Sequence, residues 1–239
     1  MKIKNWLLLL LGFAIISCGQ KKEKVVSEDT PETPSEWISL FDGETLTGWR
    51  NYNEDTISGW VVEDGMLKAL GLGADIGGDI IYDVQEFENF ELALEWKISE
   101  GGNSGIFYHV VEGDQYKALY EAAPEYQLLD DIGFPEPLEE WQKLGADYAM
   151  HLPDVNKKIV KKHGEWNTSR ILFTKDKAEH WLNGQMIVDF RPWSDDWYER
   201  RNSGKWEGMP DYGKAKKGYI GLQDHGNVIW LKNIKIREL

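Results

Sequence analysis

Between Phe90 and Ile98 a large apolar residue occupies every second position, and this pattern constrains the fold more than any other feature of the chain. Five apolar residues share one face of the extended segment: Phe90, Leu92, Leu94, Trp96 and Ile98. Glu91, Glu95 and Lys97 share the opposite face. The segment is therefore predicted to be a strand that is buried on one side.

Short apolar runs separated by turn signals continue along the chain. Asp64-Gly65 divides residues 60–70 into two runs, and Asn183-Gly184 is the strongest two-residue hairpin signal. Residues 219–222 and 228–236 are expected to form a closing pair of strands. Many short strands with turns between them predict an all-β sandwich or jelly roll.

Helical periodicity is limited to two short stretches. Residues 194–201 are predicted to form a helix capped by Ser194, and residues 136–144 are predicted to form a second one. Residues 113–124 and 131–162 have little periodicity but contain Gly, Pro, Tyr and Trp. Loops of this length are usually binding loops, so we expect them to wall a cleft on one face of the sandwich.

The N-terminus predicts the compartment. Lys2 and Lys4 precede an apolar run that is too short to span a bilayer and is typical of a signal peptide. Cys18 follows a small residue directly after this run, as in the lipobox of bacterial lipoproteins. Residues 1–17 are therefore predicted to be a lipoprotein signal peptide, with lipid attached to Cys18. The alternative is an ordinary secretory signal with an incidental cysteine.

The domain organisation follows from composition. Residues 18–36 are polar and are predicted to be a flexible tether, and residues 37–239 are long enough for one well-buried domain. The predicted location is the cell envelope, lipid-anchored to a bacterial membrane and facing the periplasm or the cell surface. Cys18 is the single cysteine, which excludes an intramolecular disulfide and a site with several thiolates.

The net charge and the aromatic content limit the kinds of binding partner that the chain can have. The net charge of −14 makes nucleic acid and a bare anionic membrane poor partners, so membrane contact is expected through the N-terminal lipid only. The chain has 12 Trp and 10 Tyr, whose amphipathic rings suit sugars but also suit the core of a β-sandwich. Both interpretations remain open.

Three polar segments interrupt the apolar pattern and are candidates for a site. They are Asn103-Ser104, Glu125 with Gln127, and Gln223-Asp224-His225. Imidazole titrates near neutrality, a carboxylate can orient it, and an amide both donates and accepts hydrogen bonds. Each segment also has an interpretation without function. The first is a common turn sequence, the second could be an edge strand with a solvated polar face, and the third could be a polar loop whose histidine has its hydrogen bonds satisfied.

Strand parity places the polar side chains of these segments. Glu125 and Gln127 should share one face of a strand, and Tyr108 and His109 should point to opposite faces. Glu125 has no acidic partner at the spacing that sandwich glucanases use on their catalytic strand. Ordinary glycoside hydrolysis by two carboxylates of one strand is therefore not supported.

Blocks along the whole globular part resemble the 3-keto-disaccharide hydrolase domain family. They are Leu40-Phe41-Asp42-Gly43 through Gly48-Trp49, Asn103 through Phe107, Glu125-Tyr126-Gln127 with Asp130, Gly164 through Asn167, His180 through Gly184, and Leu222 through Gly226 with Trp230 through Ile236. The resemblance implies a concanavalin A-like jelly-roll sandwich. It also implies substrates that are glycosides oxidised to a ketone at C3.

Such a substrate explains the missing carboxylate pair. A C3 ketone acidifies the C2 proton, so a base can remove it, and the substituent at C1 can then leave by elimination before water adds. We expect His225 to act as base or acid, oriented by Asp224, with Glu125 in the complementary role. Asn103, Gln127 and Gln223 would hold hydroxyl groups or the enolate oxygen. The other candidate substrate-binding residues of these blocks are Ser104, His109, Asp130 and Trp181.

One position departs from the family pattern. His109 stands where many members carry Arg, which offers a second imidazole. His109 is therefore also a candidate metal ligand, and a set of two His, one Glu and one Asp could bind a divalent metal ion as a cofactor that polarises the ketone. The alternative function is that of a non-catalytic, lectin-like carbohydrate-binding lipoprotein on the same fold.

Overall fold

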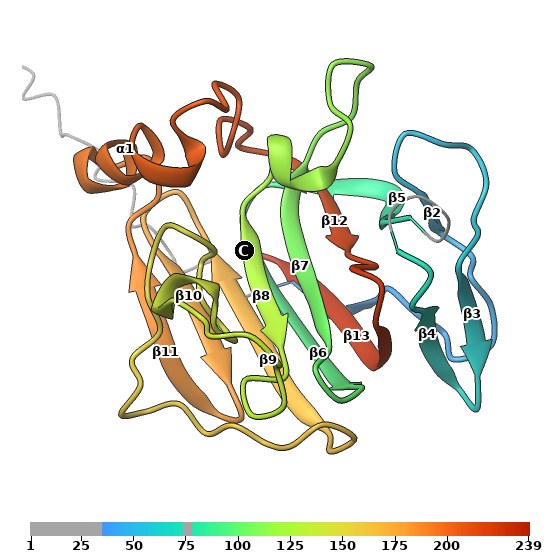
Figure 1. Ribbon diagram of the computed structural model, residues 1–239. Helices are drawn as coiled ribbons and strands as arrows, with labels where there is room; N and C mark the ends of the chain where they lie inside the picture. The colour runs from blue at the N-terminus through green and yellow to red at the C-terminus, as the bar shows by residue number, and fades with distance from the viewer. Residues whose placement is uncertain (1–34, 74–77) are drawn as a thin grey trace, which may run out of the picture. The chain divides into compact units, whose positions relative to one another are not determined.

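The computed structural model describes residues 35–73 and 78–239, which form two antiparallel β-sheets packed face to face (Figure 1). The predicted signal peptide, Cys18 and nearly all of the predicted tether lie outside the described residues. Within the described part, no helix is both long and apolar enough to cross a membrane. The predicted all-β sandwich is confirmed.

The larger sheet contains eight strands in the order β11-β10-β9-β6-β13-β4-β3, with β1 paired to β13. The bounds of its strands are β1 Ile38–Ser39, β3 Trp60–Glu63, β4 Met66–Leu70, β6 Phe90–Ile98, β9 Asn167–Phe173, β10 Ala178–Leu182, β11 Gln185–Phe190 and β13 Val228–Glu238. Both predicted hairpins are present, β3–β4 and β10–β11. Asp64 and Asn183 have φ of 50° and 48°, which is the left-handed conformation that two-residue hairpin turns need.

The smaller sheet contains five strands in the order β2-β5-β12-β7-β8. Their bounds are β2 Trp49–Asn51, β5 Ile80–Phe87, β7 Asn103–Val110, β8 Glu125–Leu129 and β12 Gly218–Leu222. The inner faces of the two sheets meet in one core. Strand β6 contributes the five apolar residues of its alternating pattern to this core, including Trp96, which is 1% exposed.

The predicted closing pair is wrong. Strand β12 pairs with β5 and β7 in the smaller sheet, whereas β13 pairs with β6, β4 and β1 in the larger one. Residues 223–227 therefore cross from one sheet to the other. Apolar alternation identifies both strands as buried, but it carries no information about which sheet each of them joins.

One of the two predicted helices forms as expected. Helix α1 spans Asp195–Arg201, and the Ser194 side chain caps it by accepting a hydrogen bond from the Trp197 backbone N–H. The second predicted helix is reduced to one 3₁₀ turn, η2 Glu140–Gln142.

Irregular segments cover part of the outer side of the smaller sheet. Near η1 Leu119–Glu121, Leu119 and Ala123 pack against Phe107 and Ile81. The 3₁₀ turn η3 Gly204–Trp206 contributes Trp206 to the buried cluster that also contains Trp197 of α1. These segments leave the side chains at the start of β8 facing a pocket. The sequence predicts that the long irregular stretches wall a cleft, and residues of both stretches line this pocket.

Candidate active site

A pocket of about 320 Å³ lies over the ends of β7, β8 and β12, within the usual size range of small-molecule sites. Six predicted site residues line it, namely Asn103, Glu125, Gln127, Gln223, Asp224 and His225. The lining also includes Asp79, Tyr120, Tyr148 and Lys205, which sequence reasoning missed. The three polar segments of the sequence therefore meet at one place.

Glu125 is the buried acid of the pocket. Glu125 is 5% exposed, and the loss of water around its carboxyl group raises its pKa to about 8. The Lys205 ammonium opposes this shift. Asp79 and Asp147 raise the pKa further through their negative charge. Glu125 is therefore protonated at neutral pH and can give a proton to a substrate oxygen.

Gly105 on the neighbouring strand makes room for this carboxyl group. A Cβ atom at Gly105 would stand 2.4 Å from Oε1 of Glu125. We expect Gly105→Ala to displace the carboxyl group and to lower kcat/KM roughly tenfold or more, with little change in Tm. Steady-state kinetics on the oxidised glycoside that the family resemblance implies, together with a thermal melt, measure both effects. Unchanged kcat/KM in the folded variant would show that the position of the carboxyl group does not matter.

Two amide side chains are fixed beside Glu125. Nε2 of Gln127 donates to Oδ1 of Asn103 at 3.2 Å and to the Gln142 carbonyl at 3.1 Å. The Asn103 backbone N–H in turn donates to Oδ1 of Asn227 at 3.2 Å. These contacts hold both amides in place without a ligand, so they can bind the polar groups of a ligand at little entropic cost.

Asp224 has a different role from the predicted one. Its carboxylate accepts backbone hydrogen bonds from Leu72, Gly73 and Gly226 at 3.2, 3.3 and 2.9 Å. In the described part of the chain no hydrogen bond joins it to the His225 imidazole, which is exposed at the rim of the pocket. Asp224 thus orders the backbone around the pocket, and the expected orientation of His225 by Asp224 is not seen.

Asp79 adds a second acid with a raised pKa. Burial raises the pKa of Asp79 to about 7, and the charge of Asp224 raises it further, whereas the hydrogen bond from the Asp224 N–H lowers it. That N–H lies 3.1 Å from Oδ1 of Asp79. A carboxyl group that titrates near neutrality can accept or give a proton, so Asp79 is a further candidate for proton transfer.

Lys205 places a cation at the pocket wall. Its Nζ lies 4.1 Å from the ring centroid of Tyr148, 5.1 Å from that of Trp206 and 5.8 Å from that of Trp141. The residue as a whole is exposed, but partial loss of water around its ammonium group lowers the pKa of Lys205, and the nearby Glu125 opposes this shift. An ammonium group held by aromatic faces beside a neutral acid can stabilise negative charge on a bound oxygen.

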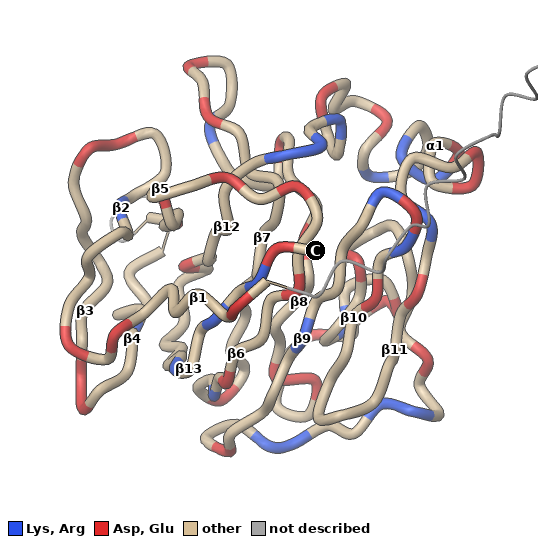
Figure 2. Tube along the Cα trace, turned by 180° about the vertical axis from the view of Figure 1, so that it is seen from behind, with Lys and Arg blue, Asp and Glu red and all other residues tan. Residues whose placement is uncertain are grey.

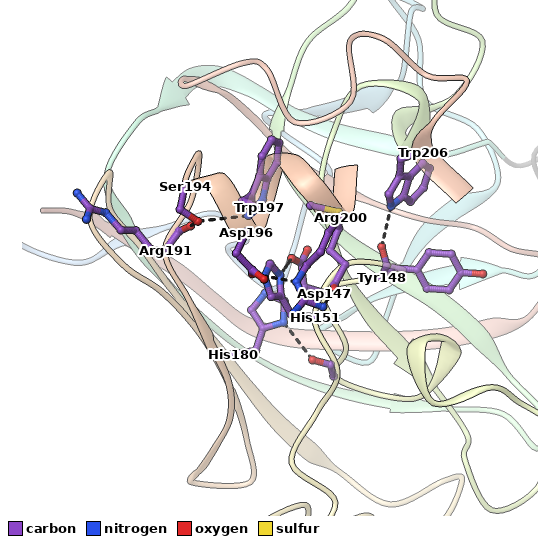
Figure 3. Close-up of polar contacts among 12 residues, drawn as sticks. Asp147, Tyr148, His151, His180, Arg191, Ser194, Asp196, Trp197, Arg200 and Trp206 are labelled. Carbon is purple, nitrogen blue, oxygen red and sulfur yellow. Dashed lines mark hydrogen bonds and ion pairs between the residues drawn. The ribbon is translucent and has the colours of Figure 1, made fainter. Parts of the chain in front are cut away.

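A polar network that runs from the buried Asp147–His151 pair to exposed groups of α1 supports this wall (Figure 3). Nδ1 of His151 lies 2.7 Å from Oδ2 of Asp147, and Nε2 of His151 lies 3.4 Å from Oδ2 of Asp196. Oδ2 of Asp196 also accepts a hydrogen bond from Nε of Arg200 at 2.9 Å. Asp147 precedes Tyr148, whose backbone N–H donates to the Glu125 carbonyl at 3.0 Å. The network therefore ties α1 to the segment that carries Tyr148.

Trp206 closes the same wall from η3. Its Nε1 donates to the Tyr148 carbonyl at 3.1 Å, a contact drawn in Figure 3. The Trp206 ring also stacks on Tyr212 with 3.9 Å between ring centroids. Lys205 is therefore carried by a turn that is anchored on both sides.

His109 lies away from the pocket, in the core. Its φ of 54° turns the strand, so Tyr108 and His109 both contact Phe90 and Phe173 instead of pointing to opposite faces. Nε2 of His109 lies 2.9 Å from the Glu88 carbonyl, and burial lowers its pKa to about 4. The substrate-binding role and the metal-ligand role predicted for His109 are therefore not supported.

Three other predicted residues are also not brought to the pocket. Oγ of Ser104 points inward and donates to the Gln223 carbonyl at 2.8 Å. Asp130 is 2% exposed and accepts from the Gly101 backbone N–H at 2.9 Å. Trp181 lies on the outer face of the larger sheet. Ser104 and Asp130 hold loops that shape the pocket, and neither side chain lines it.

Because His109 lies in the core, the candidate metal site lacks one of its four proposed ligands. Among residues 35–73 and 78–239, no group of three or more His, Cys, Asp or Glu side chains is arranged to hold a metal ion. The chemistry available from the described residues is proton transfer by Glu125, Asp79 and His225, with Lys205 as a fixed positive charge.

Comparison with known proteins connects this geometry to a family. Residues 36–237 match the model of the 3-keto-alpha-glucoside-1,2-lyase-like domain. The chain is 34% identical to the 3-keto-disaccharide hydrolase of Bacteroides thetaiotaomicron, with 92% of this chain and 85% of that protein covered.

Two crystal structures from Parabacteroides distasonis ATCC 8503, both provisionally named glycosyl hydrolases, have the same fold. One is 44% identical to this chain with a TM-score of 0.79, and the match covers 85% of this chain and 94% of that chain. The other is 32% identical with a TM-score of 0.64, and the match covers 86% of this chain and 100% of that chain.

Proposed function

The chain belongs to the 3-keto-alpha-glucoside-1,2-lyase-like domain family, and on this premise we propose that it cleaves the glycosidic bond of 3-keto-glycosides. The observation that carries the proposal is the placement of Glu125, a buried acid whose pKa is raised to about 8, in one pocket with Lys205 and His225. The name of the Bacteroides relative, a 3-keto-disaccharide hydrolase, supports this substrate class.

The proposed reaction begins at C2. The His225 imidazole takes the C2 proton, and the electron pair moves onto the C3 oxygen, where the Lys205 ammonium stabilises the negative charge. The enolate then re-forms the C3 carbonyl while the C1–oxygen bond breaks, and Glu125 gives its proton to the leaving oxygen. Addition of water, with hydroxyl at C1 and a proton at C2, completes a net hydrolysis. Asn103, Gln127 and Gln223 hold the sugar hydroxyl groups.

Sugar release from oxidised and ordinary disaccharides tests the proposal. The purified protein is incubated with 3-keto-trehalose and 3-keto-sucrose, and with trehalose and sucrose as unoxidised controls. We expect release from at least one oxidised sugar and none from the controls. Binding without any release would favour the lectin-like alternative. Faster release from the unoxidised sugars would favour direct hydrolysis with Glu125 and Asp79 as the acid pair.

Replacing Lys205 tests its assignment. We expect Lys205→Met to lower kcat/KM for a 3-keto-glucoside by about 100- to 1,000-fold, because the charge that stabilises the enolate is lost. The ammonium also favours ionised Glu125, so its loss raises the pKa of Glu125 and moves the alkaline decline of activity to higher pH. A pH profile of kcat/KM measures both effects. Lys205→Arg should keep the alkaline limb near its original position, and an unshifted profile in Lys205→Met would contradict the assignment.

We also propose that the protein is a lipoprotein of the cell envelope, anchored by lipid on Cys18. The short apolar run before a lone cysteine supports this. When the full chain is expressed in a bacterium, it should partition into the detergent phase of a phase-separating extraction. The Cys18→Ala variant should stay as the larger, uncleaved precursor. Cleavage at the same position in that variant would indicate an ordinary secretory signal.

A further inference from the structure

A second hollow of about 560 Å³ lies on the outer face of the larger sheet, in the sheet that does not carry the candidate active site. Four of its side chains form one row across the paired strands. Lys235 on β13 is opposite Ala93 on β6, Ala93 is opposite Arg170 on β9, and Arg170 is opposite Trp181 on β10. Figure 2 shows this side of the molecule, with basic residues on β9 and β13.

Ala93 is the reason for the hollow. Its neighbours in the row, Lys235 and Arg170, have long side chains, while Ala93 contributes a single methyl group. On the same face of β6, the residues two positions away are the larger Glu91 and Glu95. The small side chain of Ala93 therefore lowers the floor of the hollow between these longer side chains.

Two indole rings flank this gap, and each lies against cationic side chains. The Arg170 guanidinium lies 4.0 Å from the Trp181 ring centroid, and Nε1 of Trp181 donates to Oε2 of Glu179 at 2.9 Å. Lys235 and Arg237 each lie 4.8 Å from the Trp37 ring centroid. Rings that are held in place in advance lose little entropy when a ligand stacks on them.

Polar and charged side chains complete the lining of the hollow. Arg170 is paired with Glu91 at 2.7 Å, and Oε1 of Glu95 accepts from Nδ2 of Asn233 at 2.6 Å. Thr168 adds a hydroxyl group. Aromatic faces beside fixed amide, hydroxyl and carboxylate groups match the apolar C–H faces and polar edges of a sugar ring.

We propose that this hollow, formed by Trp37, Ala93, Thr168, Arg170, Trp181 and Asn233, is a second carbohydrate site that binds a neutral oligosaccharide. It explains why Trp181, expected from the sequence to contact sugar, lies away from the catalytic pocket. A glycan chain held here would keep the protein on a polymer while the other sheet acts on smaller oxidised sugars. The site binds sugar whether or not the catalytic proposal holds.

Calorimetric titration with maltohexaose, cellohexaose and laminarihexaose tests the site. We expect the wild-type protein to bind at least one of them, and Ala93→Trp and Trp181→Ala to weaken that binding about tenfold or more. Ala93→Trp places an indole ring in the floor of the hollow without removing a polar group. Turnover of 3-keto-disaccharides should stay at the wild-type rate in both variants.

Trp230→Ala is the matched control, because Trp230 lies on the same sheet face but does not line the hollow. It should bind as the wild type does, and so should Gln127→Ala in the catalytic pocket. The proposal is overturned if no hexasaccharide binds, or if binding survives both hollow variants. It is also overturned if the face instead binds lipid vesicles or a second copy of the chain, seen by vesicle sedimentation and light scattering.

Discussion

Replacing Glu125 by Gln is expected to lower kcat/KM for a 3-keto-glucoside by about 100- to 10,000-fold, the usual contribution of a general acid. The amide has the shape of the protonated carboxyl group but has no proton to give to the leaving oxygen. Steady-state kinetics measure the loss. Glu140→Gln, on the exposed turn η2, is the matched control and should keep wild-type activity.

The same variant has a signature in stability. Unfolded Glu125 ionises near its ordinary pKa of 4.5, whereas the folded group stays protonated up to about 8. The native state therefore holds an extra proton between these values, and the wild type loses stability relative to Glu125→Gln as pH rises through them. Denaturant unfolding at several pH values measures this difference. A pH-independent difference would show that Glu125 is not held neutral by burial.

Replacing His225 by Ala is expected to abolish cleavage of a 3-keto-glucoside, with a loss of about 100-fold or more, and to leave the fold intact. The imidazole is exposed at the rim of the pocket, so its removal creates no cavity in the core. Circular dichroism and a thermal melt check the fold, and sugar release checks the activity.

His163 offers the matched control for His225. It is an exposed histidine on a loop, with Nδ1 3.2 Å from Oδ2 of Asp130, and it does not line the pocket. His163→Ala should therefore cleave the substrate at close to the wild-type rate. Near-normal turnover in His225→Ala would remove His225 from the mechanism and would leave Asp79 as the remaining candidate base.

Local patterns predicted the strands and much of the pocket. The alternation of β6 and the turn sequences of the two hairpins depend on neighbouring residues, so they are visible in the sequence. Strand parity also placed Glu125 and Gln127 on one face of β8, and both line the pocket. The resemblance to a family supplied the connection between the three polar segments.

Features that depend on long-range packing were missed. The φ of 54° at His109 turns that side chain into the core, and parity cannot foresee a left-handed residue inside a strand. Lys205 reaches the pocket only because Trp206 anchors its turn against Tyr148 and Tyr212. Asp79 was not predicted because it precedes β5, far in sequence from the strand that carries Glu125.

The fate of the C2 hydrogen tests the central claim most directly. A 3-keto-glucoside labelled with deuterium at C2 is cleaved by the enzyme in ordinary water, and the released keto sugar is analysed by mass spectrometry. Labelled 3-keto-glucose incubated without enzyme corrects for spontaneous exchange. Cleavage by proton abstraction and elimination predicts that the enzymatic product loses the deuterium. A product that keeps the deuterium in full would contradict the account and would indicate direct displacement at C1.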